Sequence, residues 1–296
     1  MRNQSNKIHD RAETIYQIVI CLIVGILCVI CLFPLIYILG MSFTSEGEMI
    51  AKHYFVIIPE HPTTAAYEFI FRQQNFINSV MVSVLRSIVT TLLSVIFVLV
   101  AGYSISEPEL PGRKYMMLFI IVTMMIGAPL IPVYLWFVNL KLLNTFWVMV
   151  FPCLGYTYGI LVIKTFIEGV PRDIIDSADI DGAGDINKLI RIIFPLTLPS
   201  LAAIALFVAV GQWNSWFDAL VFITSNKKII PVSLVIRNLL TTTSQQTATQ
   251  QSLLVRMAPE TMKMASVVLA ILPIMCVYPF LQKYFVLGVF TGSVKG

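Results

Sequence analysis

This chain of 296 residues is poor in charge and in the side chains that usually bind metals or carry out catalysis. Only 12% of its residues are Asp, Glu, Lys or Arg, whereas 57% are hydrophobic. Soluble domains usually carry about 25% charged residues, so this composition favours a membrane protein. The net charge of +4 is mild and the basic residues are scattered between apolar runs, which argues against a nucleic-acid partner.

Cysteine and histidine are scarce and form no metal-binding pattern. The five cysteines lie inside apolar runs, and the Cys28–Cys31 pair has neither a second pair nor a neighbouring histidine. No HExxH, GxSxG or GxxxxGK[ST] pattern is present. We therefore expect no catalytic residue, no metal site and no ATP hydrolysis in this chain, and a membrane enzyme is disfavoured.

Six long apolar runs dominate the sequence. A helix that crosses the hydrocarbon core needs about 20 mostly apolar residues, and a spanning helix satisfies its own backbone. We therefore predict an all-α polytopic membrane protein with six transmembrane helices in a single domain over residues 1–296. The predicted spans are about 14–41, 77–104, 115–138, 144–166, 194–217 and 264–284.

The basic residues near the ends of these runs favour an orientation with the N-terminus inside. The short basic head and the turn Glu107–Lys114 carry most of this bias. Six spans then place both termini in the cytoplasm. The same count puts residues 45–76 and 218–263 outside and the loop 171–195 inside.

The segment Pro171–Pro199 is polar and broken by glycine, although apolar runs flank it. Pro171 suits the first turn of a helix, and Gly182 is expected to break that helix. A second short helix is expected from about Asp185 to Phe194, with Pro195 and Pro199 ending it. Two short helices at an angle fit a groove on a soluble partner, and an interfacial hairpin without a partner is the alternative.

The middle of this segment resembles the EAA loop of ABC importer permeases, the loop that docks on an ATPase. The usual pattern reads E-A-A-x-x-D-G-A, followed by a proline further along. The matching residues here are Asp176, Ser177, Ala178, Asp181, Gly182, Ala183 and Pro195. Asp replaces the usual Glu and Ser replaces the first Ala. The resemblance implies that these seven residues couple the chain to ATP hydrolysis.

Further segments are similar to the carbohydrate permeases of the LplC/YtcP type, which are related to the MalG-like subunits of maltose importers and to subunits of alginate importers. These segments are Leu110–Lys114, Gly211–Trp216, Tyr278–Tyr284 and Gly292–Gly296. The resemblance covers nearly the whole chain. It implies the type I (MetI-like) permease fold of ABC importers. It also implies the import of an oligosaccharide, neutral or acidic, across the cytoplasmic (inner) membrane of a bacterium.

The same resemblance implies several partners. A second permease subunit, expected to be a different chain in this subgroup, completes the path, and an ATPase dimer binds ATP and Mg. An extracytoplasmic solute-binding protein delivers the carbohydrate, with the loop 218–263 reaching toward it. The chain itself contacts membrane lipid and holds no cofactor. An ion-coupled secondary transporter is the alternative, although it normally needs intramembrane acids and a repeat that are missing here.

Aromatic and amide residues gather at the outer end of the fifth run. They are Gln212, Trp213, Asn214, Trp216 and Asp218. Aromatic faces beside amides suit sugar rings and hydroxyls, and buried polar groups in a membrane usually face a cavity. We therefore take these five residues as candidates for the substrate path, with an aromatic belt and helix–helix hydrogen bonds as an equal alternative.

Arg86 is the sole charge deep within an apolar run. It could snorkel to the outer interface, pair with an acid on another helix, or meet an anionic substrate. Its position near the start of the run favours snorkelling.

Overall fold

The computed structural model describes residues 3–72, 76–246 and 260–276, and within these ranges the chain is helical with no β-strand. The all-α prediction is therefore confirmed for the described part. The chain divides into two compact units. One comprises Met1–Arg72 with Leu239–Leu269, and the other comprises Gln73–Asn238 with Ala270–Gly296.

The first unit begins with one long helix, α1 (Asn3–Ser42), followed by α2 (Glu46–Ala51) and α3 (Ala65–Arg72). None of the most apolar stretch of α1 is buried within the chain. A small core closes the end of α1 and contains Met41, Met49 and Val56. The start of the unit thus consists of an exposed apolar helix with a small packed cluster at its end.

Glu48 in α2 holds the loop that follows this helix. Its carboxylate accepts the backbone N–H of Glu60 at 2.7 Å and the Nζ of Lys52 at 3.0 Å. The Glu60 N–H, together with Lys52 and the His61 N–H, lowers the pKa of Glu48 because these donors favour the charged carboxylate. One acidic side chain therefore organises the polar loop of this unit.

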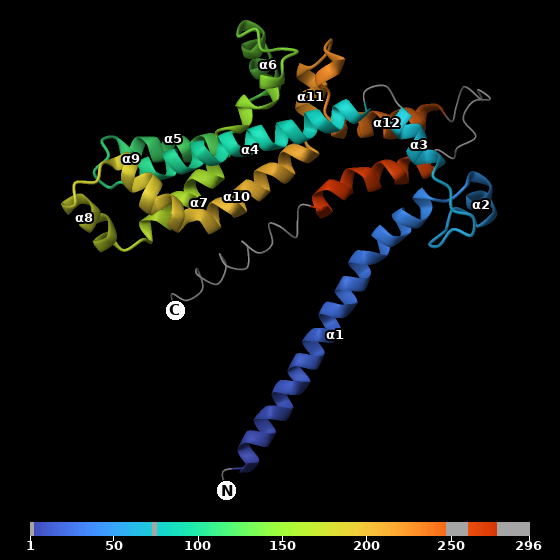
Figure 1. Cartoon of the computed structure of the whole chain (residues 1–296), viewed down its shortest axis with the longest axis horizontal. Helices are drawn as coiled ribbons and strands as arrows, with labels where there is room; N and C mark the ends of the chain where they lie inside the picture. Colours follow the sequence, from blue (N-terminus) through green and yellow to red (C-terminus); the bar gives the residue numbers. More distant parts are fainter. Residues whose placement is uncertain (1–2, 73–75, 247–259, 277–296) are drawn as a thin grey trace. The chain divides into compact units, whose positions relative to one another are not determined.

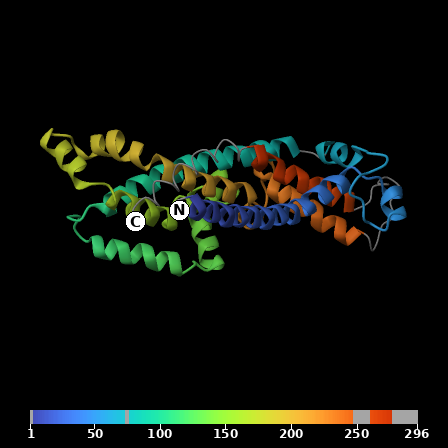
Figure 2. The ribbon, with the colours of Figure 1, turned by 90° about the horizontal axis from the view of Figure 1, so that it is seen from below.

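The second unit is built on α4 (Phe76–Ser106), α7 (Thr157–Glu168) and α10 (Phe194–Asn214). α4 packs against both α7 and α10, and both views show α4 and α10 side by side (Figure 1, Figure 2). Aliphatic side chains fill the space between the three helices: Val98, Ile105, Ile160, Ile163, Ile167, Ile193, Leu201, Ile204 and Val208. This cluster forms the main core of the unit.

Shorter elements surround this core. They are α5 (Arg113–Met125), α6 (Leu130–Asn139), α8 (Arg172–Ile180), α9 (Asp185–Lys188), α11 (Phe217–Phe222) and the 3₁₀ turns Phe146–Met149, Phe151–Cys153 and Lys227–Ile229. α12 (Val232–Gln246) begins in this unit, and its residues from Leu239 on belong to the first unit. A second cluster packs beneath α6 and α11 and contains Phe137, Val148, Met149, Ala219, Phe222, Ile223 and Leu234.

α4 carries its polar residues inside and its apolar residues outside. The buried stripe consists of Ser79, Ser83, Arg86, Thr90 and Ser94. These positions recur every three or four residues and so share one helix face. The large apolar residues of the same helix are exposed: Ile77, Met81, Leu85, Ile88, Leu92 and Ile96. A soluble helix shows the reverse pattern, so α4 is suited to a lipid environment.

Three helical stretches are long and apolar enough to cross a membrane: Glu13–Ser42, Phe76–Ser106 and Asp185–Asn214. The number rises to five if each of two bent helix pairs counts as one span. The predicted span 264–284 extends beyond the described residues, which are helical over 260–276. The predicted count of six spans and the single domain therefore stay predictions.

The third and fourth apolar runs are not straight helices. The chain bends by 113° between α5 and α6, and Gly127 and Pro129 lie in the link between them. The fourth run starts as 3₁₀ turns around Pro152, becomes α-helical at Thr157, and bends by 41°. Proline removes a backbone donor and restricts the residue before it, which explains why the helices break at these places.

The expectation that Pro195 and Pro199 end the second helix of the polar segment is wrong. α9 passes through a π turn, Leu189–Ile193, directly into α10. The π turn shifts the hydrogen-bond register just before Pro195, which then stands at the first positions of α10, where a missing N–H is tolerated. Pro199 lies inside α10. Asp185–Asn214 is therefore one helical run.

Gly102 allows α4 to approach α7 closely. A Cβ added at Gly102 would lie 2.8 Å from the Ile163 Cγ2 and 3.3 Å from the Lys164 backbone nitrogen, whereas a Cβ at Gly211 would meet nothing within 4 Å. We predict that Gly102→Ala unfolds more easily than the matched helical variant Gly211→Ala, by about 1–3 kcal/mol, because of overpacking. Unfolding of the detergent-solubilised protein measures this difference. Equal stability of the two variants would contradict the close α4–α7 contact.

Candidate functional site

α8 ends in a tight turn centred on Gly182. The Gly182 N–H donates to the Asp179 carbonyl at 3.1 Å, and the Ala183 N–H donates to the Ala178 carbonyl at 2.9 Å. This pair of bonds is the Schellman arrangement, which needs a left-handed residue after the helix. Gly182 has φ +75°, a conformation that costs other residues about 1–2 kcal/mol. Glycine therefore fixes the direction in which the chain leaves α8, as the sequence predicted.

Lys188 ties the two sides of this turn together. Its Nζ lies 2.7 Å from the Asp179 Oδ1 and 3.0 Å from the Asp185 Oδ1. One cation thus bridges the end of α8 and the start of α9. Sequence reasoning missed both Lys188 and Asp179 because neither is a defined position of the EAA pattern. The i,i+3 spacing of Asp185 and Lys188 was the available signal.

Six of the seven predicted coupling residues lie in this α8–α9 corner, defined as residues 172–188. Asp176, Ser177, Asp181 and Gly182 are exposed, Ala183 is half-buried and Ala178 is buried. Pro195 lies outside the corner, at the start of α10. Asp176 and Asp181 are exposed, and neither takes part in the ion pairs that Lys188 makes with Asp179 and Asp185.

Two isoleucines flank the turn and are turned away from the protein. Ile180 is 88% exposed and Ile186 is 73% exposed. Two exposed isoleucines beside the exposed carboxylates of Asp176 and Asp181 give the corner an apolar centre with a polar edge, the arrangement of many protein–protein contacts. The α8–α9 corner therefore has the composition of a small protein-docking surface, called the docking knob below.

We predict that Gly182→Ala loosens the end of α8. The left-handed backbone then carries a side chain, which should lower the local stability by about 1 kcal/mol and speed amide exchange in α8 about fivefold. Gly184→Ala is the matched control, because Gly184 has φ −69° and a Cβ there would meet no atom within 4 Å. Hydrogen–deuterium exchange of the two variants measures the effect, and equal exchange rates would contradict a strained position at Gly182.

The five predicted substrate-path residues do not form one open site. Trp213 is buried and its Nε1 donates to the Ala270 carbonyl at 2.9 Å. Asn214 is exposed and its Nδ2 donates to the Val210 carbonyl at 3.0 Å. The Arg237 guanidinium carbon lies 3.8 Å from the centre of the Trp216 ring. Three of the five residues thus have defined and different surroundings.

The other two predicted residues, Gln212 and Asp218, bind Arg86. The Arg86 Nε donates to the Gln212 Oε1 at 2.9 Å, and both Nη atoms donate to the Asp218 carboxylate. Arg86 is fully buried, so the favoured prediction of snorkelling is wrong. The acid of another helix is within reach, and pairing in place avoids carrying the charge along the helix to the interface.

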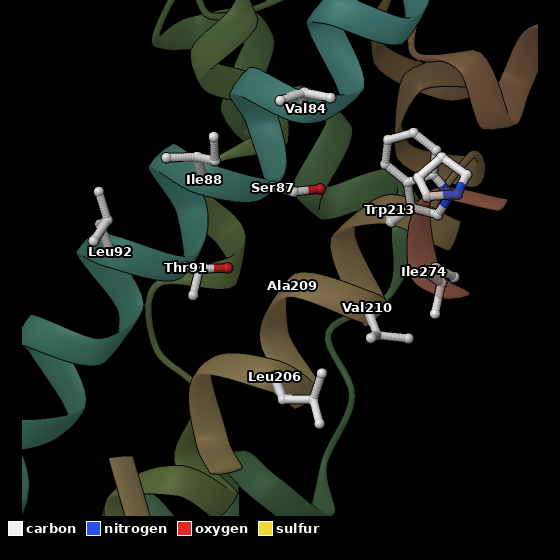
Figure 3. A pocket seen from close by; sticks show the side chains of 11 residues that line it. Val84, Ser87, Ile88, Thr91, Leu92, Leu206, Ala209, Val210, Trp213 and Ile274 are labelled. Carbon is white, nitrogen blue, oxygen red and sulfur yellow. The ribbon is translucent and has the colours of Figure 1, made fainter. Parts of the chain in front are cut away.

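A hollow of about 390 Å³ lies between α4, α10 and residues 273–274 (Figure 3). Trp213 is the one predicted path residue that lines it. Figure 3 shows the hydroxyls of Ser87 and Thr91 directed from α4 toward α10. Both hydroxyls are buried and lack a hydrogen-bond partner in the described chain. The remaining lining is almost entirely apolar, so the hollow offers little to a hydrated ligand in this state.

Comparison with known proteins relates the whole chain to transport systems. Residues 76–290 match the family described as binding-protein-dependent transport system inner membrane component. Protein LplC of Bacillus subtilis (strain 168) is 35% identical, over 97% of this chain and 97% of its own length. The polygalacturonan/rhamnogalacturonan transport system permease protein YtcP of the same organism is 32% identical, over 90% of this chain and 93% of its own.

Solved structures agree with these relatives. A bacterial ABC transporter involved in the import of the acidic polysaccharide alginate aligns with a TM-score of 0.80 and 28% identity, over 93% of this chain and 98% of that chain. A bacterial alginate ABC transporter in complex with an alginate pentasaccharide-bound periplasmic protein aligns with a TM-score of 0.59 and 14% identity, and shares the fold. The resemblance to carbohydrate importer permeases and the MetI-like fold are thereby confirmed. The chain belongs to the family of binding-protein-dependent transport system inner membrane components.

Proposed function

We propose that this permease is driven by an ATPase that grips the α8–α9 corner, and that it carries an acidic oligosaccharide across the inner membrane. The observation that carries the first part is the exposure of Ile180 and Ile186 on a knob rimmed by Asp176 and Asp181. Apolar anchors within a polar rim are typical of protein–protein contacts. A groove with an apolar floor and basic edges on the ATPase would complement this knob.

The corner is continuous with α10. α9 continues through the π turn into α10, and the helical run Asp185–Asn214 contains 30 residues. At 1.5 Å per residue such a run is about 45 Å long. A displacement of the corner would therefore move the α10 residues near Trp213 as part of the same rod. ATP and Mg would bind to the partner ATPase subunits, since this sequence has no phosphate-binding loop.

The proposed substrate and remaining partners follow from the relatives. The names of YtcP and of the alginate importer refer to polygalacturonan/rhamnogalacturonan and alginate, which supports an acidic oligosaccharide as the cargo. A second permease chain would complete the path, and a solute-binding protein would deliver the sugar from outside. The termini would lie in the cytoplasm. Part of the loop 218–263 that we expect to meet the binding protein, residues 247–259, lies outside the described residues.

Ion-coupled secondary transport is a weaker alternative. Such a carrier needs an intramembrane acid that can bind and release an ion. Asp218 is the acid nearest to that role, and its carboxylate is occupied by both Nη atoms of Arg86. An acid neutralised by a buried arginine is a poor coupling site, so the external ATPase is favoured as the energy source.

We predict that Ile180→Asn combined with Ile186→Asn weakens the association with the ATPase at least tenfold. Each buried isoleucine contributes about 1.5–3 kcal/mol, and 1.4 kcal/mol corresponds to a factor of ten. The measurement is the amount of ATPase subunit that co-purifies with the tagged permease. Ile58→Asn is the control, because Ile58 is 80% exposed but lies on the predicted outer side. Undiminished co-purification of the double variant would contradict docking at the corner.

A further inference from the structure

The second unit holds a fully buried arginine, Arg86, on a helix that is long and apolar enough to cross a membrane. Arg86 is about 15 Å along α4 from Phe76, at 1.5 Å per residue, and its side chain is 0% exposed. Charges at such depth are rare and usually functional. A buried ion pair contributes little net stability compared with well-packed apolar residues. The use of Arg86 must therefore be sought in what it holds in place.

We propose that Arg86 is a positioning residue for transport: it fixes the break between α10 and α11 and thereby orients Asn214 and Trp216 toward the passing sugar. This inference rests on the proposed import of an oligosaccharide. Arg86 does not touch the sugar in this arrangement, because it is enclosed and its charge is neutralised by Asp218.

The break itself is the first observation. α10 ends at Asn214 and α11 begins at Phe217, with Ser215 in an extended conformation at ψ 124°. Non-helical backbone at membrane depth leaves carbonyls that the protein must satisfy. The Ser215 carbonyl accepts the Arg86 Nη1 at 3.3 Å and the Ser233 Oγ at 2.7 Å. Arg86 thus binds the freed backbone directly.

The carboxylate of Asp218 closes the network on the other side of the break. Its Oδ1 accepts the Ser215 Oγ at 3.0 Å and the Ala219 N–H at 2.9 Å, in addition to Arg86. The planar guanidinium therefore contacts α10 through Gln212, the break through Ser215 and α11 through Asp218. A lysine offers a single charged group and could not span these three sites.

The network places two sugar-compatible groups beside the break. Asn214 is exposed, and its one hydrogen bond in the described chain uses the Nδ2, which leaves the Oδ1 as an acceptor. Trp216 is half-buried, with Arg237 over its ring. An amide and an aromatic ring are suited to the hydroxyls and the apolar face of a sugar, and these two residues lie on either side of a helix break. Both residues directly flank Ser215, the residue that Arg86 fixes.

The test uses the complete transporter in proteoliposomes, with its ATPase, second permease and binding protein, and trigalacturonate as the probe. The key variant is Arg86→Gln with Asp218→Asn, which removes both charges and keeps hydrogen-bonding groups. We expect normal assembly and binding-protein-stimulated ATPase activity within about twofold, but about five- to tenfold less sugar imported per ATP hydrolysed. Arg86→Lys should show the same defect, because lysine keeps the positive charge but lacks the several N–H donors of the planar guanidinium.

Arg113→Gln is the matched control. Arg113 also pairs with a carboxylate, that of Glu168, but at the other end of α4, near Ile105. The Arg113→Gln transporter should import as much sugar per ATP hydrolysed as the wild type. A wild-type ratio in both Arg86 variants would overturn the positioning role and leave the proposed import intact. A wild-type transporter that imports neither trigalacturonate, alginate trisaccharide nor maltotriose would overturn the proposed function and this inference together.

Discussion

A single buried positive charge constrains the arrangement of the second unit. Arg86 stands on the polar face of α4 and must be neutralised there, since neither lipid nor the aliphatic core can solvate it. Asp218 supplies the counter-charge, Gln212 and Ser215 supply the remaining acceptors, and the Met149 sulfur lies 3.7 Å away. These contacts connect Arg86 to α10, to the break at Ser215 and to α11.

The helical run Asp185–Asn214 connects two different parts of the second unit. Its polar end is the α8–α9 corner, held by Gly182 and Lys188 and bearing exposed isoleucines. Its other end is the break at Ser215, held by Arg86. The π turn lets proline residues stand within this run without ending it. A continuous helical run between the corner and the break at Ser215 is the route by which the proposed ATPase would act on the proposed sugar path.

Local features were readable from the sequence, and long-range ones were not. Gly182 after an acidic stretch predicted the turn, because a left-handed residue after a helix is a local requirement. The π turn before Pro195 was not predictable, since its register shift depends on packing beyond the local pattern. The Arg86–Asp218 pair joins residues separated by 132 positions, and nothing in either neighbourhood identifies the other. For that reason, Gln212 and Asp218 were candidates for the substrate path with helix–helix hydrogen bonds as an equal alternative, and the structure shows both residues bonded to Arg86. The bend between α5 and α6 lies at Gly127 and Pro129, but its angle depends on packing and could not be derived from the sequence.

The claim that energy enters through the α8–α9 corner can be tested most directly by site-specific photo-crosslinking in intact cells. A photoreactive amino acid would replace Ile180, and separately Ile58, which is similarly exposed. Crosslinking of the ATPase subunit from position 180, with none from position 58, is the predicted result. Absence of an ATPase adduct at position 180 in a transporter that still imports sugar, or its appearance at position 58, would contradict the claim.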